Sequence, residues 1–190
     1  MAWKPDYATA AELKSWLHVA DTDDDTLMAI WVTTASRAVD SWARRQFGRV
    51  ASAESRTYDT VWDRVDETYV AVIDDVDDVT ELAVTDSNGD AVTSYTLQPV
   101  NALKKGKPYE RMVTATKGPL TISALWGWTA VPSAVKNATL LQAARLANRR
   151  SSPYGVAGSP TEGSEMRLLA TLDPDVKTSL IDFRRKWWAG

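Results

Sequence analysis

The stretch Trp126-Gly-Trp-Thr-Ala-Val-Pro-Ser-Ala-Val-Lys136 marks the change from a segment rich in strand-forming residues to a helical one. Pro132 suits the first turn of a helix, where its missing N–H costs no hydrogen bond. Residues 138–147 are mostly Ala and Leu, with little polar face. Because small alanine side chains let neighbouring helices approach closely, this stretch predicts the central helix of a helical core.

Two more helices are predicted near the N-terminus. Thr9-Ala-Ala-Glu12 has the pattern of a capping box at the start of the first. Asp21-Thr-Asp-Asp-Asp25 begins the second, since acidic residues favour a helix N-terminus, and Gly48 is the expected stop. The second helix has two adjacent apolar stripes, which are Leu27, Trp31, Thr34, Ala38 and Trp42, and Met28, Val32, Ala35 and Val39. We expect this helix to be covered on two sides, by its own bundle or by a neighbouring subunit.

Residues 50–126 have a different character, with Val, Thr and Tyr alternating with polar residues. Ser87-Asn-Gly-Asp90 is typical of a hairpin turn, because Asn-Gly adopts the positive φ angles that such turns need. We expect a small, mainly antiparallel β unit of four to six strands. The expected strands are residues 68–73, 79–84, 93–97, 111–116 and 120–125.

A long loop and a last helix follow the central helix. Residues 151–163 are dominated by Gly, Pro and Ser, which is typical of an extended loop. Asp173-Pro-Asp175 has the cap, the first-turn proline and the acidic residue of a helix start. The whole pattern predicts an α+β fold, a four-helix core with the β unit inserted into it. The expected segments are residues 1–49, 50–126 and 127–190.

Composition restricts the class of protein. The 190 residues include 44% hydrophobic and 25% charged ones, as in a globular fold. The absence of cysteine excludes disulfides and thiolate metal sites, and no stretch approaches the roughly 20 apolar residues of a membrane span. We therefore expect a protein that is made in a reducing cytoplasm and has no contact with a membrane.

The net charge of −3 is unevenly distributed. It is −1 over residues 1–49, −6 over residues 50–126 and +4 over residues 127–190. This asymmetry fits complementary contacts between copies or with partners as well as it fits solvated surfaces of different composition. Nine tryptophans exceed what one core of this size needs, and Trp is enriched at interfaces. Some of them are therefore expected to face other subunits.

The chain has no convincing motif for catalysis, a cofactor or a metal. His18 is the only histidine, and we expect it to be structural. Asp21-x-Asp23-x-Asp25 lacks the Gly and the distal Glu of a calcium loop, so helix capping is favoured. Residues 74–78, Asp-Asp-Val-Asp-Asp, are better explained as an acidic hairpin edge that discourages strand pairing than as a cation site. Ser133-x-x-Lys136 lacks the companion motifs of acyl-transferring enzymes.

Nucleic-acid binding is the other alternative. Basic side chains mixed with aromatic ones, at residues 149–150 and 184–188, could contact phosphates and bases. However, the isoelectric point near 5.2 is far from that of a typical DNA-binding domain. Basic residues near helix C-termini are also explained by the helix dipole. We therefore favour a protein that does not bind DNA specifically.

The order of elements resembles a known family, the head–tail connector (adaptor) proteins of long-tailed phages. The N-terminal part, from Tyr7-Ala-Thr-Ala-Ala-Glu-Leu-Lys-Ser-Trp-Leu17 to Arg44-Arg-Gln-Phe-Gly48, looks like the start of these proteins. Residues 126–136, Ala143-Ala-Arg-Leu146, Arg149 to Gly158 and Asp173-Pro-Asp-Val176 are similar to the second half of the family in actinobacterial phages. The resemblance covers residues 7–48 and 126–186. The β segment departs from the minimal helical pattern of the family.

The resemblance implies a structural virion protein rather than an enzyme. Subunits of the family pack into a ring, here expected to have twelve copies, which joins the portal to the neck or tail. The ring leaves a channel through which DNA passes without specific binding. The implied partners are other copies, the portal protein and a stopper or tail-completion protein, and the implied location is the virion neck. Another neck protein, such as a stopper or tail-completion subunit, is the alternative.

Ring formation requires two different contact patches on each subunit. The stripes of the second helix, the Gly/Pro loop and the aromatic–basic C-terminus are the expected patches. The residues expected at the subunit or portal interface are Trp31, Trp42, Arg149, Arg150, Pro153, Tyr154, Gly155, Val156, Phe183, Arg184, Arg185, Trp187 and Trp188.

Overall fold

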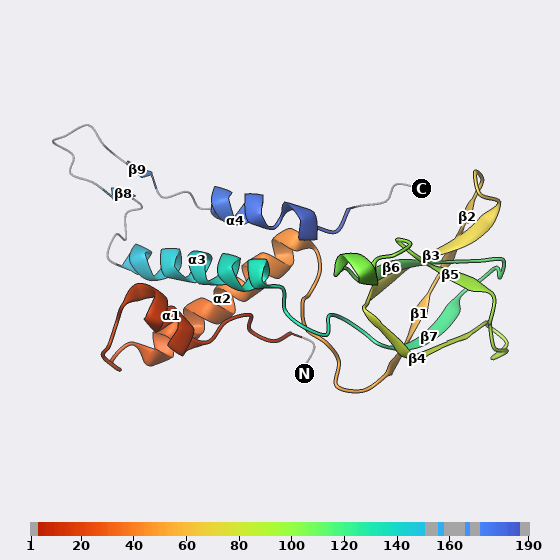
Figure 1. The fold of residues 1–190 in the computed structure, drawn as a ribbon, viewed down its shortest axis with the longest axis horizontal. Helices are drawn as coiled ribbons and strands as arrows, with labels where there is room; N and C mark the ends of the chain where they lie inside the picture. Colours follow the sequence, from red (N-terminus) through yellow and green to blue (C-terminus); the bar gives the residue numbers. More distant parts are fainter. Residues whose placement is uncertain (1–3, 151–155, 158–165, 168–171, 187–190) are drawn as a thin grey trace. The chain divides into compact units, whose positions relative to one another are not determined.

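The computed structural model describes residues 4–150, 156–157, 166–167 and 172–186. The chain divides into two compact units. Among the described residues, the helical unit lies within Pro5–Arg45 and Val131–Arg185, and the sheet unit contains Gln46–Ala130. The chain thus contains both helices and antiparallel sheets, so the expected α+β class is confirmed (Figure 1).

The helical unit is built around α3 (Ser133–Arg150), which contacts α1 (Ala10–Leu17), α2 (Asp25–Ala43) and α4 (Pro174–Ser179) (Figure 1). The central position expected for this helix is therefore confirmed. Its alanines allow the close packing, since Ala143 and Ala144 lie buried against α1 and α2. The buried residues of this core are Ala8, Leu13, Met28, Val32, Ala35, Leu140, Ala143 and Ala144.

Local capping signals place two of the helix starts. The Thr9 hydroxyl accepts from the Glu12 N–H, and the Glu12 carboxylate accepts from the Thr9 N–H, which confirms the capping box. Asp173 caps α4 through the Asp175 N–H, with Pro174 in the first turn, as expected.

The capping box supports one quantitative prediction. A Thr9→Ala change removes the acceptor for the Glu12 N–H and should lower the free energy of unfolding by about 1 kcal/mol. Urea denaturation followed by circular dichroism measures this difference. Thr34→Ala, at an exposed position within α2, is the matched control and should change stability by less than about 0.5 kcal/mol.

Two helix ends differ from expectation. α2 ends at Ala43 because Arg44 adopts a left-handed conformation with φ 56°, so the stop expected at Gly48 is wrong by several residues. α4 has only six residues and is followed by a 3₁₀ turn, η2 (Ile181–Phe183). Among the described residues, three helices have eight or more residues.

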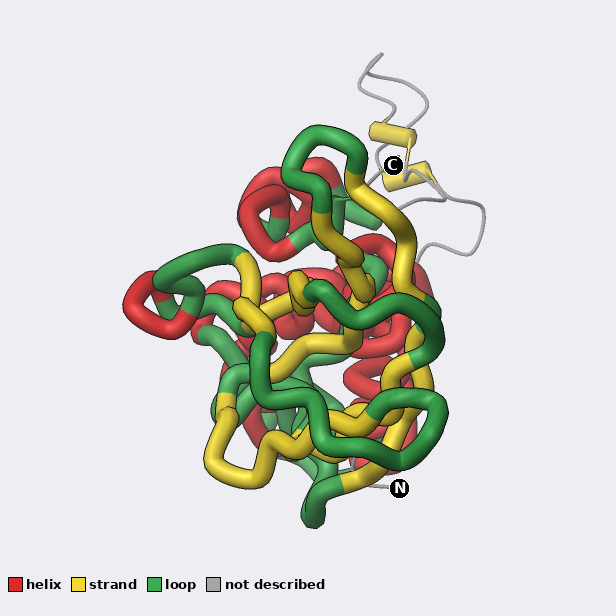
Figure 2. Tube along the Cα trace, turned by 90° about the vertical axis from the view of Figure 1, so that its right-hand side faces the viewer, coloured by secondary structure: helices red, strands yellow, loops and turns green. Residues whose placement is uncertain are grey.

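The sheet unit has two antiparallel sheets (Figures 1 and 2). One has the order β1 (Glu54–Tyr58), β7 (Leu120–Leu125), β4 (Asp78–Thr85). The other has the order β2 (Thr60–Asp63), β3 (Thr68–Val76), β6 (Tyr109–Thr114), β5 (Tyr95–Gln98). These seven strands exceed the expected four to six, because β1 has a mostly polar sequence and β2 is only four residues long. The turn expected at residues 87–90 is present, closed by a bridge between Thr85 and Ala91.

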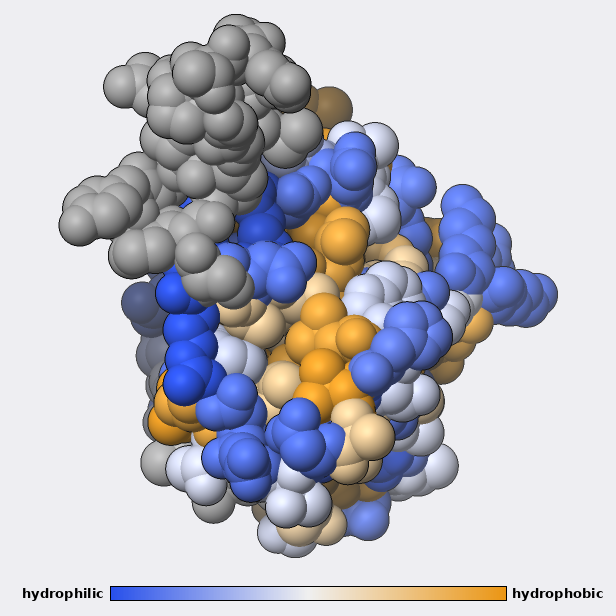
Figure 3. Space-filling model, turned by 90° about the vertical axis from the view of Figure 1, so that its left-hand side faces the viewer, coloured by the Kyte–Doolittle hydropathy of each residue, from blue (hydrophilic) through white to orange (hydrophobic). Residues whose placement is uncertain are grey.

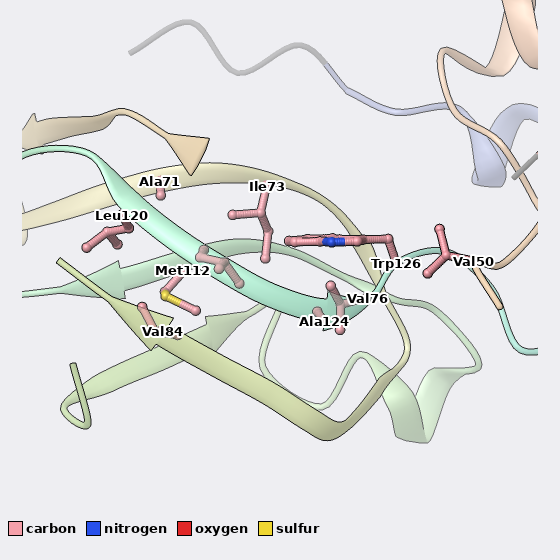
Figure 4. Packing of buried hydrophobic residues seen from close by; sticks show 10 residues of the cluster. Val50, Ala71, Ile73, Val76, Val84, Met112, Leu120, Ala124 and Trp126 are labelled. Atoms are coloured by element: carbon pink, nitrogen blue, oxygen red, sulfur yellow. The ribbon is translucent and has the colours of Figure 1, made fainter. Parts of the chain in front are cut away.

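Side chains of both sheets form a common core. Figure 4 shows side chains from β3, β6, β7 and β4 directed towards one another, with Trp126 beside Ile73. The buried members are Val50, Ala71, Ile73, Val76, Val84, Met112, Leu120, Ile122, Ala124 and Trp126. A short 3₁₀ turn, η1 (Leu103–Lys105), lies in the exposed basic loop between β5 and β6. A two-residue pair, β8 (Val156–Ala157) and β9 (Met166–Arg167), completes the described elements.

Candidate assembly surfaces

The two stripes of α2 have different surroundings. Met28, Val32, Ala35 and Val39 are buried, so this stripe belongs to the interior of the helical unit. The other stripe remains only partly covered, and Trp31 packs against the edge of the core. Figure 3 shows apolar side chains gathered on one face of the molecule and bordered by hydrophilic ones.

Further apolar side chains of the helical unit are exposed. Trp16 on α1 and Ile30 on α2 are both about half exposed to solvent. Isolated apolar residues are normal on a protein surface, but a large aromatic and a large aliphatic side chain on adjacent helices are suited to contact with another molecule. The helical unit therefore has large apolar side chains on its surface as well as in its core.

A basic corner lies where the end of α2 meets the segment after η2. We define this basic corner by Trp42, Arg44 and Arg184. The Arg185 N–H donates to the Ala43 carbonyl oxygen at 2.8 Å, which holds the two segments together. The Arg184 guanidinium carbon lies 5.3 Å from the centroid of the Trp42 ring, a cation–π contact.

The basic corner unites residues that are far apart in the sequence. Trp42, Arg184 and Arg185 were expected at an interface on separate grounds, and the structure brings them together. Arg44 and Arg184 are exposed, whereas Trp42 and Phe183 are partly buried. The corner thus offers one exposed guanidinium over a partly buried aromatic ring and a second exposed positive charge at the end of α2.

The basic pair at the end of α3, Arg149 and Arg150, is not part of the basic corner. Arg150 forms an ion pair with Asp24, with its Nη1 2.5 Å from the Asp24 Oδ1. Asp24 precedes α2, so this contact joins the end of α3 to the start of α2. Arg149 is partly buried. Pro153, Tyr154, Gly155, Trp187 and Trp188 lie outside the described residues, and Val156 is described only as part of β8.

The acidic run at residues 74–78 is not a solvated edge, so the expectation for it is wrong. Asp75 is buried and its Oδ2 accepts from the Trp128 Nε1–H at 2.8 Å. Asp77 accepts from the Thr129 hydroxyl at 2.8 Å, and Asp78 accepts from Arg49 at 2.9 Å. Most of these carboxylates therefore bind groups at the root of the sheet unit, which we define as residues 46–50 and 126–130.

Asp74, the first residue of the run, belongs to a second cluster with β1. It accepts from the Arg56 Nη1–H at 2.7 Å and from the Tyr58 hydroxyl at 2.8 Å. Glu54 also pairs with Arg56, at 3.1 Å. The carboxylates act as internal hydrogen-bond acceptors that hold β1 and β3 together.

Burial, together with the nearby Asp74 carboxylate, raises the pKa of Tyr58 well above its usual range. Since the folded pKa exceeds that of the unfolded chain, this contribution to stability is complete below about pH 10 and is lost as pH rises through the folded pKa. We expect the free energy of unfolding to fall more steeply above pH 10 in the native chain than in Tyr58→Phe. Urea denaturation at pH 8 to 11 tests this, and identical slopes would contradict it.

The close pairing at the root depends on Gly127. The Trp128 N–H donates to the Gly48 carbonyl oxygen at 3.0 Å, and the Gly127 N–H donates to the Asp75 carbonyl oxygen at 2.6 Å. Gly127 has φ 112°, and a Cβ placed on it would lie 1.9 Å from the Gly48 carbonyl oxygen. The two chain segments that bound the sheet unit are thus joined at a distance that only glycine allows.

The residues considered above for catalysis or metal binding occupy structural positions. His18 is the left-handed residue that ends α1, and Lys136 forms an ion pair with Glu12. Asp24 and Asp25, from the calcium-like pattern, pair with Arg150 and Lys14. In the part of the chain that the structure describes, no group of three or more His, Asp or Glu side chains is arranged to hold a metal ion. Within the same residues, no helix is long and apolar enough to cross a membrane.

The β2–β3 hairpin is a surface that was not among the patches expected from the sequence. Val61 and Trp62 on β2, and Val65 at the turn, are exposed apolar residues. Trp62 packs edge-on against Tyr69 at 4.8 Å between ring centroids. A signal was present, since Val65 lies within the charged stretch Asp63-Arg-Val-Asp-Glu67. Exposure could not be read from it, because that depends on β2 being the outermost strand of its sheet.

Comparison with known proteins gives one informative likeness. No protein-family model matches the chain, and no curated protein matches it either. Among solved structures, the chain is similar to one in the neck of an empty GTA particle computed with C6 symmetry. The similarity covers 95% of this chain and 91% of that chain, with a TM-score of 0.50 and 18% sequence identity. The two chains therefore share a fold over nearly their whole lengths.

Proposed function

We propose that this protein is a structural subunit of the neck of a phage-like particle, a head–tail connector (adaptor) that assembles into a ring. The ring joins the portal to the rest of the neck or the tail and leaves a channel for DNA. The observation that carries the proposal is the fold shared, over nearly the whole chain, with a chain of the neck of a GTA (gene transfer agent) particle.

The surfaces of the helical unit support the proposal. A ring needs two different patches on each subunit. The partly covered stripe of α2 with Trp31 is one apolar candidate, and the basic corner is a second, chemically different one. In this proposal α1, α2 and α3, with α4 and η2 as a short fourth element, form the connector core.

The proposed number of copies is twelve. The C6 symmetry of the GTA neck structure is compatible with rings of six or twelve copies, since both contain a sixfold axis. Mass measurement of the assembled ring distinguishes these two numbers.

The test is assembly with the portal protein of the same particle. The purified chain is mixed with purified portal and observed by negative-stain electron microscopy and mass photometry. We expect annular oligomers attached to the portal ring. The portal must be present because a connector subunit can remain monomeric until it meets its partner. A chain that stays monomeric and never associates with the portal would exclude the connector function.

A stopper or tail-completion subunit is the alternative within the neck. Deletion of residues 151–163 distinguishes the two, because the Gly/Pro loop is proposed to contact the portal only in a connector. We expect the deletion to abolish portal binding while the thermal unfolding of the protein is unchanged. Portal binding that survives the deletion would favour the alternative.

A further inference from the structure

The β2–β3 hairpin carries apolar surface on both of its faces. Val61 pairs with Val70 across the two strands, and Val72 lies two residues further along β3, so these three share one face of the sheet. Val61 is 59% and Val72 is 49% exposed, although Val70 between them is buried. Trp62, which is 46% exposed, and the partly buried Tyr69 form an aromatic pair on the opposite face.

The tip of the hairpin is apolar as well as acidic. Val65 is 90% exposed at the turn between the strands. Residues 59–69 carry four acidic side chains, Asp59, Asp63, Asp66 and Glu67, and one basic side chain, Arg64. Figure 1 shows this hairpin at the β2 end of the sheet unit, away from β4. The hairpin thus combines an apolar strip with a net charge of −3.

The basic corner has the complementary chemistry. Arg184 is an exposed cation over the partly buried Trp42 ring, and the exposed Arg44 follows directly after the last residue of α2. Arg45 and Arg185 are also positively charged and lie next to them in the sequence, and Asp40 on α2 and Asp182 on η2 are acidic residues within four positions of them. An aromatic ring under one guanidinium group, at a helix end that carries further arginines, can receive an aliphatic side chain and the carboxylates around it.

We infer that the β2–β3 hairpin of one copy docks on the basic corner of the adjacent copy. The inference rests on the proposed ring and assigns the sheet unit a part in forming it. A head-to-tail ring needs two different, complementary patches on each subunit, and the hairpin and the corner are such a pair. Two hairpins do not suit one another because both are acidic, and a like-charge contact is unfavourable.

The chemistry favours a second copy of this chain as the binding partner over an added β-strand or DNA. β2 is an edge strand of only four residues next to an acidic turn, features that discourage the addition of another strand. DNA would be attracted to the basic corner but repelled by the hairpin. A second copy of this chain satisfies both surfaces at once.

Charge exchange tests the contact in the presence of the portal. Asp66→Lys with Glu67→Lys, and separately Arg44→Glu with Arg184→Glu, should each raise the protein concentration needed for ring assembly about tenfold or more. The four changes combined should restore assembly, because the charges are then exchanged rather than removed. Glu81→Lys with Asp90→Lys is the matched control, since it makes the same change of charge at exposed positions outside the hairpin.

Covalent cross-linking tests the geometry independently of assembly strength. The chain has no native cysteine, so Val65→Cys with Arg44→Cys introduces one thiol on the hairpin and one in the corner. With a short bismaleimide, the double variant should give a ladder of covalent oligomers that ends at the ring size. A mixture of the two single variants should give covalent dimers only. Val79→Cys with Arg44→Cys is the control, because Val79 is exposed on β4 of the other sheet.

The outcomes separate this inference from the proposed function. If the native chain forms no ring with the portal, the connector proposal fails, and this inference fails with it. If native rings form but the charge variants assemble equally well, or the double-cysteine variant links only within one chain, the inference alone is wrong. It is also wrong if the Arg44 and Arg184 changes abolish salt-sensitive binding to duplex DNA while ring assembly is unchanged.

Discussion

A Gly127→Ala chain is expected to lose at least about 3 kcal/mol of its free energy of unfolding. The new Cβ would lie 1.9 Å from the Gly48 carbonyl oxygen and 2.9 Å from the Arg49 Cα, so backbone rather than a flexible side chain must move. The φ of 112° adds strain for any residue with a side chain. This is a large part of the 5–15 kcal/mol that a typical domain has.

The loss should be concentrated in the sheet unit. Separation of the two root segments weakens the hydrogen bonds from Trp128 to Gly48 and from Gly127 to Asp75. Urea denaturation followed by tryptophan fluorescence measures the effect, since Trp126 and Trp128 lie at the root.

Gly89→Ala is the matched control for this prediction. Gly89 also has a positive φ, 88°, but in the described structure a Cβ there has no neighbour within 4 Å. The Gly89→Ala variant therefore has the backbone strain without the steric clash. We expect its free energy of unfolding to fall by about 1–2 kcal/mol. Equal losses in the two variants would show that the close approach of the root segments is unimportant.

Trp126→Ala is expected to lower the free energy of unfolding by about 4–5 kcal/mol. The side chain is fully buried in the core between the two sheets (Figure 4). Its Nε1–H donates to the Glu54 carbonyl oxygen at 2.6 Å, and its ring lies 5.4 Å from that of Tyr58. The Arg56 guanidinium lies 5.0 Å from the ring. The change therefore leaves a cavity and removes contacts that attach β1 to the core.

Trp16→Ala provides the comparison, because this tryptophan is half exposed on α1. We expect it to change stability by less than about 1 kcal/mol, as for other surface substitutions. Thermal unfolding monitored by far-UV circular dichroism distinguishes the two variants. A loss at Trp16 as large as that at Trp126 would contradict the assignment of Trp16 to the surface.

Short sequence patterns predicted correctly those features that depend on residues close together in the chain. The capping box at Thr9, the Asp173 cap and the Asn-Gly turn each depend on residues within four positions of one another. The same holds for β7, whose bounds agree with the predicted residues 120–125. By contrast, β1 and β2 were missed, because the polar sequence of β1 and the four-residue β2 become strands only through pairing with β7 and β3.

The candidate surfaces were predictable only in part. Residue type alone indicated Trp42 and Arg184, but their mutual contact depends on how η2 lies against the end of α2. Arg150 was expected at an interface, and in the structure it pairs with Asp24, 126 positions away. The exposure of Val61 and Val65 follows from the strand order, which no local pattern shows.

The sequence by itself determined where the chain turns helical, where two of the helices begin and that helices and antiparallel strands coexist, since propensity and capping act over a few residues. Only the tertiary structure decided the role of the acidic run and of Gly127. Asp75 is an internal acceptor because the Trp128 Nε1–H donates to it, and Gly127 is needed because the backbone of Gly48 lies against it. Such roles depend on partners dozens of positions distant, and they arise only when packing brings the two segments together.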